Sequence, residues 1–261
     1  MRSLNTAATG MLAQQLNVEV ISNNIANLNT TGFKRQRAEF QDLLYQAQRR
    51  AGTAASDAGG TVPAGIQIGL GVKPTAVYRI HEQGSLLKTD NSLDLAIQGR
   101  GFFQVTLPTG ETAYTRAGSF QLNNQGSIVT ADGFAVVGPG QVPNNATSIS
   151  VNQSGQVFVQ IPGQTALQQV GQFTMAAFIN EAGLIPIGNT NFLTSAASGD
   201  AIGGTAGTAG FGTLQQGFVE GSNVNSVNEI TSLITAQRAY EMNSKIIQAS
   251  DEMLNTVNQM R

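Results

Sequence analysis

Apolar residues at the C-terminal end of the chain recur at helical spacing from Val224 to Met260. No glycine or proline interrupts this stretch, and Asn225 or Ser226 can cap its start. At about 1.5 Å per residue such a helix would be roughly 55 Å long, so it needs an equally long partner. Its apolar positions form two rows with seven-residue spacing, Leu233, Tyr240, Ile247 and Leu254 in the first and Ala239, Ile246, Met253 and Met260 in the second.

The N-terminal end shows a matching repeat between Ser3 and Leu28, which predicts a second helix paired with the first as a coiled coil. One such pair buries a single seam, so it cannot cover every apolar row of both helices. The surplus rows predict further partners, and we expect these to be copies of the same chain. The N-terminal positions concerned are Leu4, Met11, Val18, Ile21, Ile25 and Leu28.

Between the two predicted helices the apolar period changes to two, from Ala76 onward. Short alternating runs are separated by turn-forming residues, as at Pro108–Gly110 and Asn123–Gly126. Strands of this length and spacing are typical of an antiparallel sandwich or barrel-like domain. We therefore predict an α+β chain with three parts: a terminal helical domain (1–30 and 224–261), a connecting arm (31–75) and a central, mainly antiparallel β domain (76–223).

The predicted arm begins with a polar turn. Asparagine and glycine tolerate left-handed backbone, so the first helix is expected to end within Ala26–Lys34. The next stretch, Arg35–Tyr45, fits either a short helix or an extended arm. Residues 46–75 follow, and Ala51–Gly65 within them is rich in Gly, Ala, Ser and Thr. Such a composition cannot build its own core, and taken alone it indicates a flexible linker.

Charge is sparse and nearly balanced, with 14 Lys plus Arg against 16 Asp plus Glu and a net charge of -2. This charge balance does not predict a basic surface for binding polyanions, so we do not expect nucleic acid as a partner. The chain has no cysteine, which removes disulfides and thiolate metal sites. Polar residues interrupt the apolar positions after Met1, so we expect neither a cleaved signal peptide nor a membrane span.

Residues that could carry catalysis are few. His81 is the only histidine, and the strand alternation assigns it to a solvated edge beside Glu82 rather than to a general base. Asp90 and Asp94 fit turn formers and caps. The sequence around Gly99 and Gly101 lacks the third glycine of a dinucleotide fingerprint. We expect no enzyme activity, no cofactor and no metal site.

Four stretches of the chain resemble the bacterial flagellar rod and hook family, in the order that the family shows. They are ISNNIANLNTTGFKRQRAEFQDLL near the start, SLDLAIQGRGFFQV and YTRAGSFQLNNQGSIVTADGFAVVG in the centre, and EITSLITAQRAYEMNSKIIQASDEMLNTV at the end. The first includes the family's turn motif, carried here by Asn27, Asn29, Thr31, Gly32 and Phe33. The smallest rod proteins lack most of a middle domain and the hook protein has a further outer domain. This chain is most similar to a subunit of the distal part of the rod, with the other medium-sized rod protein as the nearest alternative.

The resemblance implies a structural subunit that polymerises helically into a rigid, hollow drive shaft. It implies as partners copies of the chain, proximal rod proteins, the hook protein, and the ring proteins of the peptidoglycan and the outer membrane. The implied location is the flagellar basal body, in a rod that spans the periplasm, with export through the flagellar type III apparatus. It also implies that part of residues 46–75 stiffens the rod by wedging against neighbouring subunits.

Two readings from other classes stand beside this one. The helices could merely trimerise a secreted, adhesin-like binding module whose β domain is the functional part. An uncharacterised hydrolase is the third reading, and the missing catalytic residues count against it.

Overall fold

The computed structural model describes residues 2–50, 64–164 and 166–260. The chain divides into two compact units. The helical unit contains the residues up to Ala26, Gln36–Tyr78 and the residues from Asn225 onward. The β unit contains Asn27–Arg35 and Arg79–Val224. Two α-helices and many short antiparallel strands in the described residues confirm the predicted α+β class.

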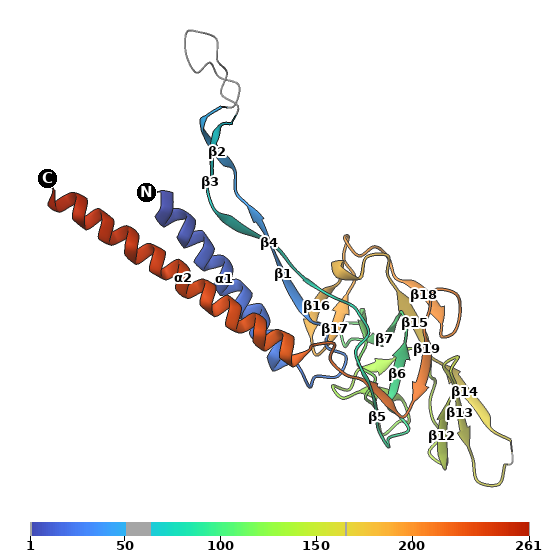
Figure 1. The fold of residues 1–261 in the computed structure, drawn as a ribbon. Helices are drawn as coiled ribbons and strands as arrows, with labels where there is room; N and C mark the ends of the chain where they lie inside the picture. Colours follow the sequence, from blue (N-terminus) through green and yellow to red (C-terminus); the bar gives the residue numbers. More distant parts are fainter. Residues whose placement is uncertain (1, 51–63, 165, 261) are drawn as a thin grey trace. The chain divides into compact units, whose positions relative to one another are not determined.

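The helical unit is built on a pair of antiparallel helices, α1 (Arg2–Ala26) and α2 (Ser226–Gln259). They lie side by side, and α2 extends beyond the start of α1 (Figure 1). Asn225 caps α2, since its side chain accepts hydrogen bonds from the backbone N–H groups of Val227 and Asn228. The predicted pairing of the N- and C-terminal helices is therefore present.

Small and polar side chains make several of the contacts between the two helices. Ser250 Oγ donates to Ser3 Oγ at 3.3 Å, and Asn24 Nδ2 donates to Glu229 Oε2 at 3.2 Å. Between these contacts, a Cβ atom on Gly10 would lie 2.9 Å from the side chain of Asn243, so the backbones approach closely there. The contacting positions are seven residues apart, or a multiple of seven, on each helix: 3, 10 and 24 on α1 and 229, 243 and 250 on α2.

The large apolar rows singled out in the sequence lie beside this seam. On α1, the row that begins at Leu4 follows the seam positions by one residue, a rotation of about 100° around the helix. On α2, the row that begins at Leu233 follows them by four residues, about 40° around the helix. The helix pair therefore uses its small residues for mutual contact and leaves the larger apolar side chains on its flanks.

An antiparallel ribbon completes the helical unit. Strand β1 (Gln36–Asp42) pairs with β4 (Val72–Arg79), and β2 (Tyr45–Arg49) pairs with β3 (Ile66–Gly69). Of the two structures expected for Arg35–Tyr45, the extended one is thus observed. Strands β2 and β3 flank the stretch interpreted as a linker, of which residues 51–63 lie outside the described part of the chain.

The β unit contains the remaining strands of the described residues and one short 3₁₀ helix, η1 (Glu181–Gly183). Its strands are β5 (Leu86–Lys88), β6 (Leu95–Gln98), β7 (Phe102–Thr106), β8 (Thr112–Thr115), β9 (Phe120–Leu122), β10 (Ile128–Thr130), β11 (Ala135–Val136), β12 (Ser148–Val151), β13 (Gln156–Gln160), β14 (Gln168–Gln172), β15 (Thr174–Ala177), β16 (Ile185–Gly188), β17 (Asn191–Leu193), β18 (Ile202–Thr205), β19 (Thr213–Gln216) and β20 (Phe218–Glu220).

Within the described residues, a nine-stranded antiparallel sheet forms the centre of the β unit. Strand β7 pairs with β8 on one side and with β15 and β11 on the other. Smaller sheets surround it: β12–β13–β14, β6 with β19, and β5 with β20. The last strands of the β unit pair with its first ones, because β19 pairs with β6 and β20 pairs with β5.

Two apolar clusters fill the β unit. The larger includes Phe103, Phe120 and Phe173, whose rings lie 5.1–6.0 Å apart. The smaller gathers Phe102, Tyr114, Phe178 and Phe192 with their neighbours. Phe102 and Phe103 are consecutive on β7 and therefore point to opposite faces, so this strand is buried on both faces.

Candidate functional site

A long apolar stripe on α2 is exposed in the single chain. Its residues follow helical spacing over the whole length of α2, and in a soluble protein such a continuous face marks an interaction surface. The exposed members are Val227, Ile230, Ile234, Met242, Ile246, Met253, Val257 and Met260. Val257 continues the seam row one repeat beyond Ser250, and the other members lie on another side of the helix from the seam positions Ala236 and Ser250, each of which is only 2% exposed.

The ribbon of the helical unit is also uncovered. Every residue of β2 is exposed, and β3 and β4 are exposed over most of their length. Large apolar side chains are exposed here, with Tyr45 on β2 at 60% and Leu44, between β1 and β2, at 82%. A two-stranded ribbon exposed in this way buries little apolar surface of its own.

The sequence-predicted assembly residues occupy three kinds of environment. Ile21 is buried. Leu4, Met11, Val18, Ile25, Leu28, Leu233, Ile247 and Leu254 are half-buried. Tyr240, Ile246 and Met253 are exposed, at 44%, 48% and 60%. The structure therefore places most of them partly at the surface of the single chain.

The turn motif after α1 belongs to the β unit. Thr30 donates its backbone N–H to Asn27 O and its hydroxyl to the Asn27 side chain, and Phe33 N donates back to Thr30 O. Gly32 N donates to Glu220 O at 2.8 Å, which ties the turn to β20. Of the other predicted motif residues, Phe33 is buried, Thr31 is half-buried and Asn29 is exposed.

Gly32 occupies a position that other residues cannot take without strain. Its φ is +70°, and an added Cβ would lie 2.6 Å from Ala117 N. Gly133 provides a matched control, because its φ is +86° and an added Cβ would meet nothing within 4 Å. We expect Gly133→Ala to cost about 1 kcal/mol of folding free energy from backbone strain alone. Gly32→Ala should cost on the order of 3 kcal/mol because steric overlap is added. Thermal unfolding of both variants tests this, and equal losses would contradict it.

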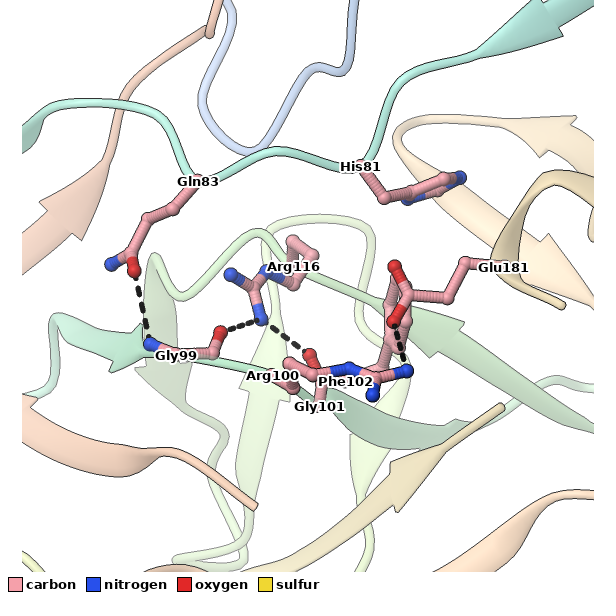
Figure 2. Close-up of a pocket in the computed structure, with 8 residues that line it drawn as sticks. All are labelled: His81, Gln83, Gly99, Arg100, Gly101, Phe102, Arg116 and Glu181. Atoms are coloured by element: carbon pink, nitrogen blue, oxygen red, sulfur yellow. Dashed lines mark hydrogen bonds and ion pairs between the residues drawn. The ribbon is translucent and has the colours of Figure 1, made fainter. Parts of the chain in front are cut away.

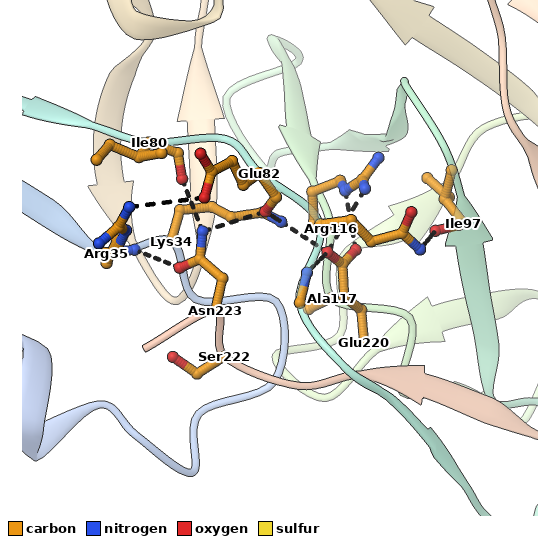
Figure 3. A network of polar contacts seen from close by, with 12 residues as sticks. Lys34, Arg35, Ile80, Glu82, Ile97, Arg116, Ala117, Glu220, Ser222 and Asn223 are labelled. Carbon is orange, nitrogen blue, oxygen red and sulfur yellow. Dashed lines mark hydrogen bonds and ion pairs between the residues drawn. The ribbon is translucent and has the colours of Figure 1, made fainter. Parts of the chain in front are cut away.

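A buried ionic cluster lies where the chain enters and leaves the β unit (Figure 3). Glu220 on β20 accepts from Lys34 Nζ at 2.6 Å and from Arg116 Nε at 2.9 Å. Its carboxylate also accepts from the backbone N–H of Gly84 at 2.9 Å. The three charged side chains are between 0% and 4% exposed. Burial lowers the pKa of Lys34, and nearby Arg116 lowers it further, whereas Glu220 opposes both effects.

Lys34 and Arg116 also donate hydrogen bonds to backbone groups. Lys34 Nζ donates to Glu82 O, and Arg116 Nη1 donates to Gly99 O and Gly101 O. Beside them, Asn223 accepts from Arg35 N at 2.7 Å and donates to Ile80 O (Figure 3). Residues 34–35, 80–84 and 220–223 are thereby joined into one polar junction, which we call the entry junction.

A cavity of about 200 Å³ adjoins the entry junction (Figure 2). It is lined by His81, Gln83, Gly99, Arg100, Gly101, Phe102, Arg116 and Glu181. Arg116 is bound to Glu220, and Arg100 donates to Glu181 at 3.4 Å and to Phe178 O. Since these charges are already paired within the chain, the cavity offers little to attract a charged ligand.

His81 packs between aromatic rings. Its ring centroid lies 5.6 Å from that of Phe102 and 5.5 Å from that of Phe192, in edge-to-face geometry. The prediction of a solvated edge position is therefore wrong, because the residues that follow β4 run along the smaller apolar cluster. Burial lowers the pKa of His81 to about 4, and the cations Lys34, Arg116 and Arg79 act in the same direction. The imidazole is neutral at neutral pH.

His81 should make the β unit sensitive to acid. Its pKa is lower in the folded chain than in the unfolded chain, so the unfolded chain binds more protons between about pH 6.5 and pH 4. Above pH 6.5 the imidazole is neutral in both states and costs the fold nothing. As the pH falls from 6.5 to 4, the free energy of unfolding decreases by up to about 3 kcal/mol. Between pH 7 and pH 4, the melting temperature of His81→Gln should fall less steeply with decreasing pH than that of the parent chain. Parallel pH profiles would contradict the assignment.

Neither described helix combines the length and apolarity needed to cross a lipid bilayer. In the same residues, no three histidine, aspartate or glutamate side chains gather as metal ligands would. The observed candidates for function are therefore surfaces and a structural junction.

Family models match three separate parts of the chain. The model "Flagella basal body rod protein" matches residues 4–34, and "Flagellar hook protein FlgE/F/G D1 domain" matches residues 96–159. "Flagellar basal body rod FlgEFG protein C-terminal" matches residues 215–260. These parts include α1 with its turn, the first half of the β unit, and α2.

Full-length relatives decide the family. The "Flagellar basal-body rod protein FlgG" of Caulobacter vibrioides is 59% identical over 261 residues, which cover all of both chains. The chain belongs to the flagellar basal-body rod protein family. The rod proteins of the same description from Agrobacterium fabrum and Borreliella burgdorferi are 51% and 46% identical, each over at least 98% of both chains. The resemblance drawn from the sequence is thus confirmed, and with it a structural role in the flagellar rod, in the basal body.

The entry junction of this rod protein was missed by sequence reasoning. Lys34 directly follows the recognised turn motif, but its partner Glu220 is 186 residues away. One signal was available: only 11% of the residues are charged, and Glu220 directly follows the apolar run Phe218–Val219. A lone acidic residue in such a strand indicates a buried ion pair.

Proposed function

We propose that this rod protein is a subunit of the distal part of the flagellar rod, which polymerises helically into a rigid hollow shaft and transmits torque to the hook. The observation that carries the proposal is the apolar stripe on α2, which stays exposed although the seam with α1 is already filled. Copies that meet head to tail along a screw axis would bury it in an open polymer.

In this proposal the terminal helices form the inner wall of the shaft and the β unit lies outside them. The flanking rows of α1 and α2 supply the contacts, with the residues named from the sequence: Leu4, Met11, Val18, Ile21, Ile25, Leu28, Leu233, Tyr240, Ile246, Ile247, Met253 and Leu254. The exposed ribbon supplies a second layer of contact, which would suppress bending of the shaft.

The partners of the shaft follow from its place in the basal body. Proximal rod proteins would adjoin one end and the hook protein the other, with the peptidoglycan and outer-membrane rings around it. The chain would reach the periplasm through the flagellar export apparatus. Its role is structural and needs no catalytic group or cofactor.

Electron microscopy of the assembled chain tests the proposal. Purified protein at high concentration should form straight tubes whose density shows helices lining a central channel. In a strain that lacks its own copy of this rod protein, expression of the chain should restore hook-basal bodies and swimming. A chain that remains a folded monomer, or that closes into trimers, would refute it.

A further inference from the structure

Asn24 is a buried polar residue at the meeting point of three elements of the helical unit. Its side chain lies near the end of α1 and is 1% exposed. Nδ2 donates to the backbone O of Gln36 at 2.9 Å and to Glu229 Oε2 at 3.2 Å. Oδ1 accepts from Gln36 N at 2.8 Å. One amide group thus binds the first residue of β1 and the first turn of α2.

The chemistry of this position specifies asparagine. Gln36 presents both a donor and an acceptor, and Glu229 presents an acceptor, so the residue at 24 must donate twice and accept once. Aspartate has the same shape but cannot donate, and it would bring a second carboxylate to Glu229. Leucine has a similar size and provides none of the three bonds. Each substitution would leave buried polar groups unpaired, which is more costly than the net gain from forming the bonds.

The other two contacts of this row define the register weakly. They involve Ser3, Gly10, Asn243 and Ser250, which are small or polar and interlock less than large apolar side chains would. In an antiparallel pair of helices, contacts of one register join residues whose numbers have a constant sum. The three cross-helix contacts share the sum 253, so they belong to a single register. A slip of one seven-residue repeat would place Asn24 opposite Ala236 and would leave the Glu229 carboxylate without its amide. Single buried polar residues are known to fix the register of paired helices in this way.

We propose that Asn24 is a positioning residue that sets the register of α1 against α2 and anchors both to strand β1. The large apolar side chains lie beside the seam. The register therefore determines how the apolar row that begins at Leu4 on α1 is aligned with the row that begins at Leu233 on α2. The proposal concerns the single chain and does not depend on the polymer.

Introduced cysteines can report the register, because the chain has none of its own. The hydroxyl oxygens of Ser3 and Ser250 are 3.3 Å apart, so Ser3→Cys with Ser250→Cys reports the observed register. Ser3→Cys with Asn243→Cys, and Ser3→Cys with Val257→Cys, report a slip of one repeat in either direction. In the otherwise unchanged full-length chain, mild oxidation should bridge the first pair at least ten times faster than the other two.

The substitutions at position 24 then test the assignment. Asn24→Leu and Asn24→Asp should each lower the rate of native bridging at least fivefold and make a slipped pair reactive, with helix content retained. Asn5→Leu, at an exposed amide of the same helix, should leave all rates unchanged. Glu229→Gln should restore much of the native bridging to Asn24→Asp, because glutamine can donate to the new carboxylate.

Three outcomes would overturn the proposal. The first is native bridging at the parental rate in Asn24→Leu. The second is failure of Glu229→Gln to rescue Asn24→Asp. The third is loss of helix in both variants at position 24 without any slipped bridging, which would make the residue a general stabiliser. Failure to form tubes with normal bridging would count against the proposed function alone.

Discussion

Ile246→Asp is expected to abolish tube formation while leaving the single chain folded. Ile246 belongs to the stripe on α2 and is 48% exposed, so the isolated chain can tolerate a carboxylate there. In a polymer the same position would be covered by a neighbour, and an unpaired charge at a dry contact costs several kcal/mol or shifts its protonation. The penalty recurs at every subunit, so the effect on assembly is large.

The measurement compares pelletable polymer and swimming with circular dichroism of the unassembled chain. Gln248→Asp is the matched control, because it adds the same charge at an exposed polar position two residues away. It should assemble normally. Straight tubes formed by Ile246→Asp would mean that this face of α2 is not covered, and the proposed packing would then be wrong.

Glu220→Gln is expected to destabilise the β unit by about 3–5 kcal/mol, since it leaves two buried cations without their counter-ion. Lys34 and Arg116 are 1% and 4% exposed and cannot turn to solvent without opening the entry junction. Glutamine keeps the size of the side chain, so the loss reports charge rather than packing. Calorimetric melts of the full-length chain measure it.

Glu82→Gln provides the comparison for Glu220→Gln. Glu82 also pairs with a cation, Arg35, at 3.6 Å, but its side chain is 70% exposed. Exposed pairs of this kind contribute about 0–1 kcal/mol, so its melting temperature should change little. Similar losses in the two variants would show that burial of the cluster does not control its contribution.

The helices could be predicted from the sequence because both depend on local signals. Asn225 is the cap that the sequence suggested, and the seven-residue spacing of Leu233, Ile247 and Leu254 does mark a half-buried flank. The seam itself could not be predicted. Hydrophobic spacing identifies large apolar side chains, whereas close helix approach depends on small ones such as Gly10.

Strands of the β unit were predicted where turn-forming residues bound a run with buried apolar side chains, as in β7. The ribbon was not, since its strands are exposed over most of their length and carry no such pattern. The position of His81 was also misjudged, because alternation along one strand does not reveal which other elements cover it. Lys34 and Glu220 meet only through the topology of the whole domain.

The entry junction brings the first and last segments of the β unit together, at residues 34–35 and 220–223. A module whose two ends meet can be enlarged or exchanged without altering the spacing of the segments that carry it. This organisation would let evolution vary the middle of such chains while their ends stay alike.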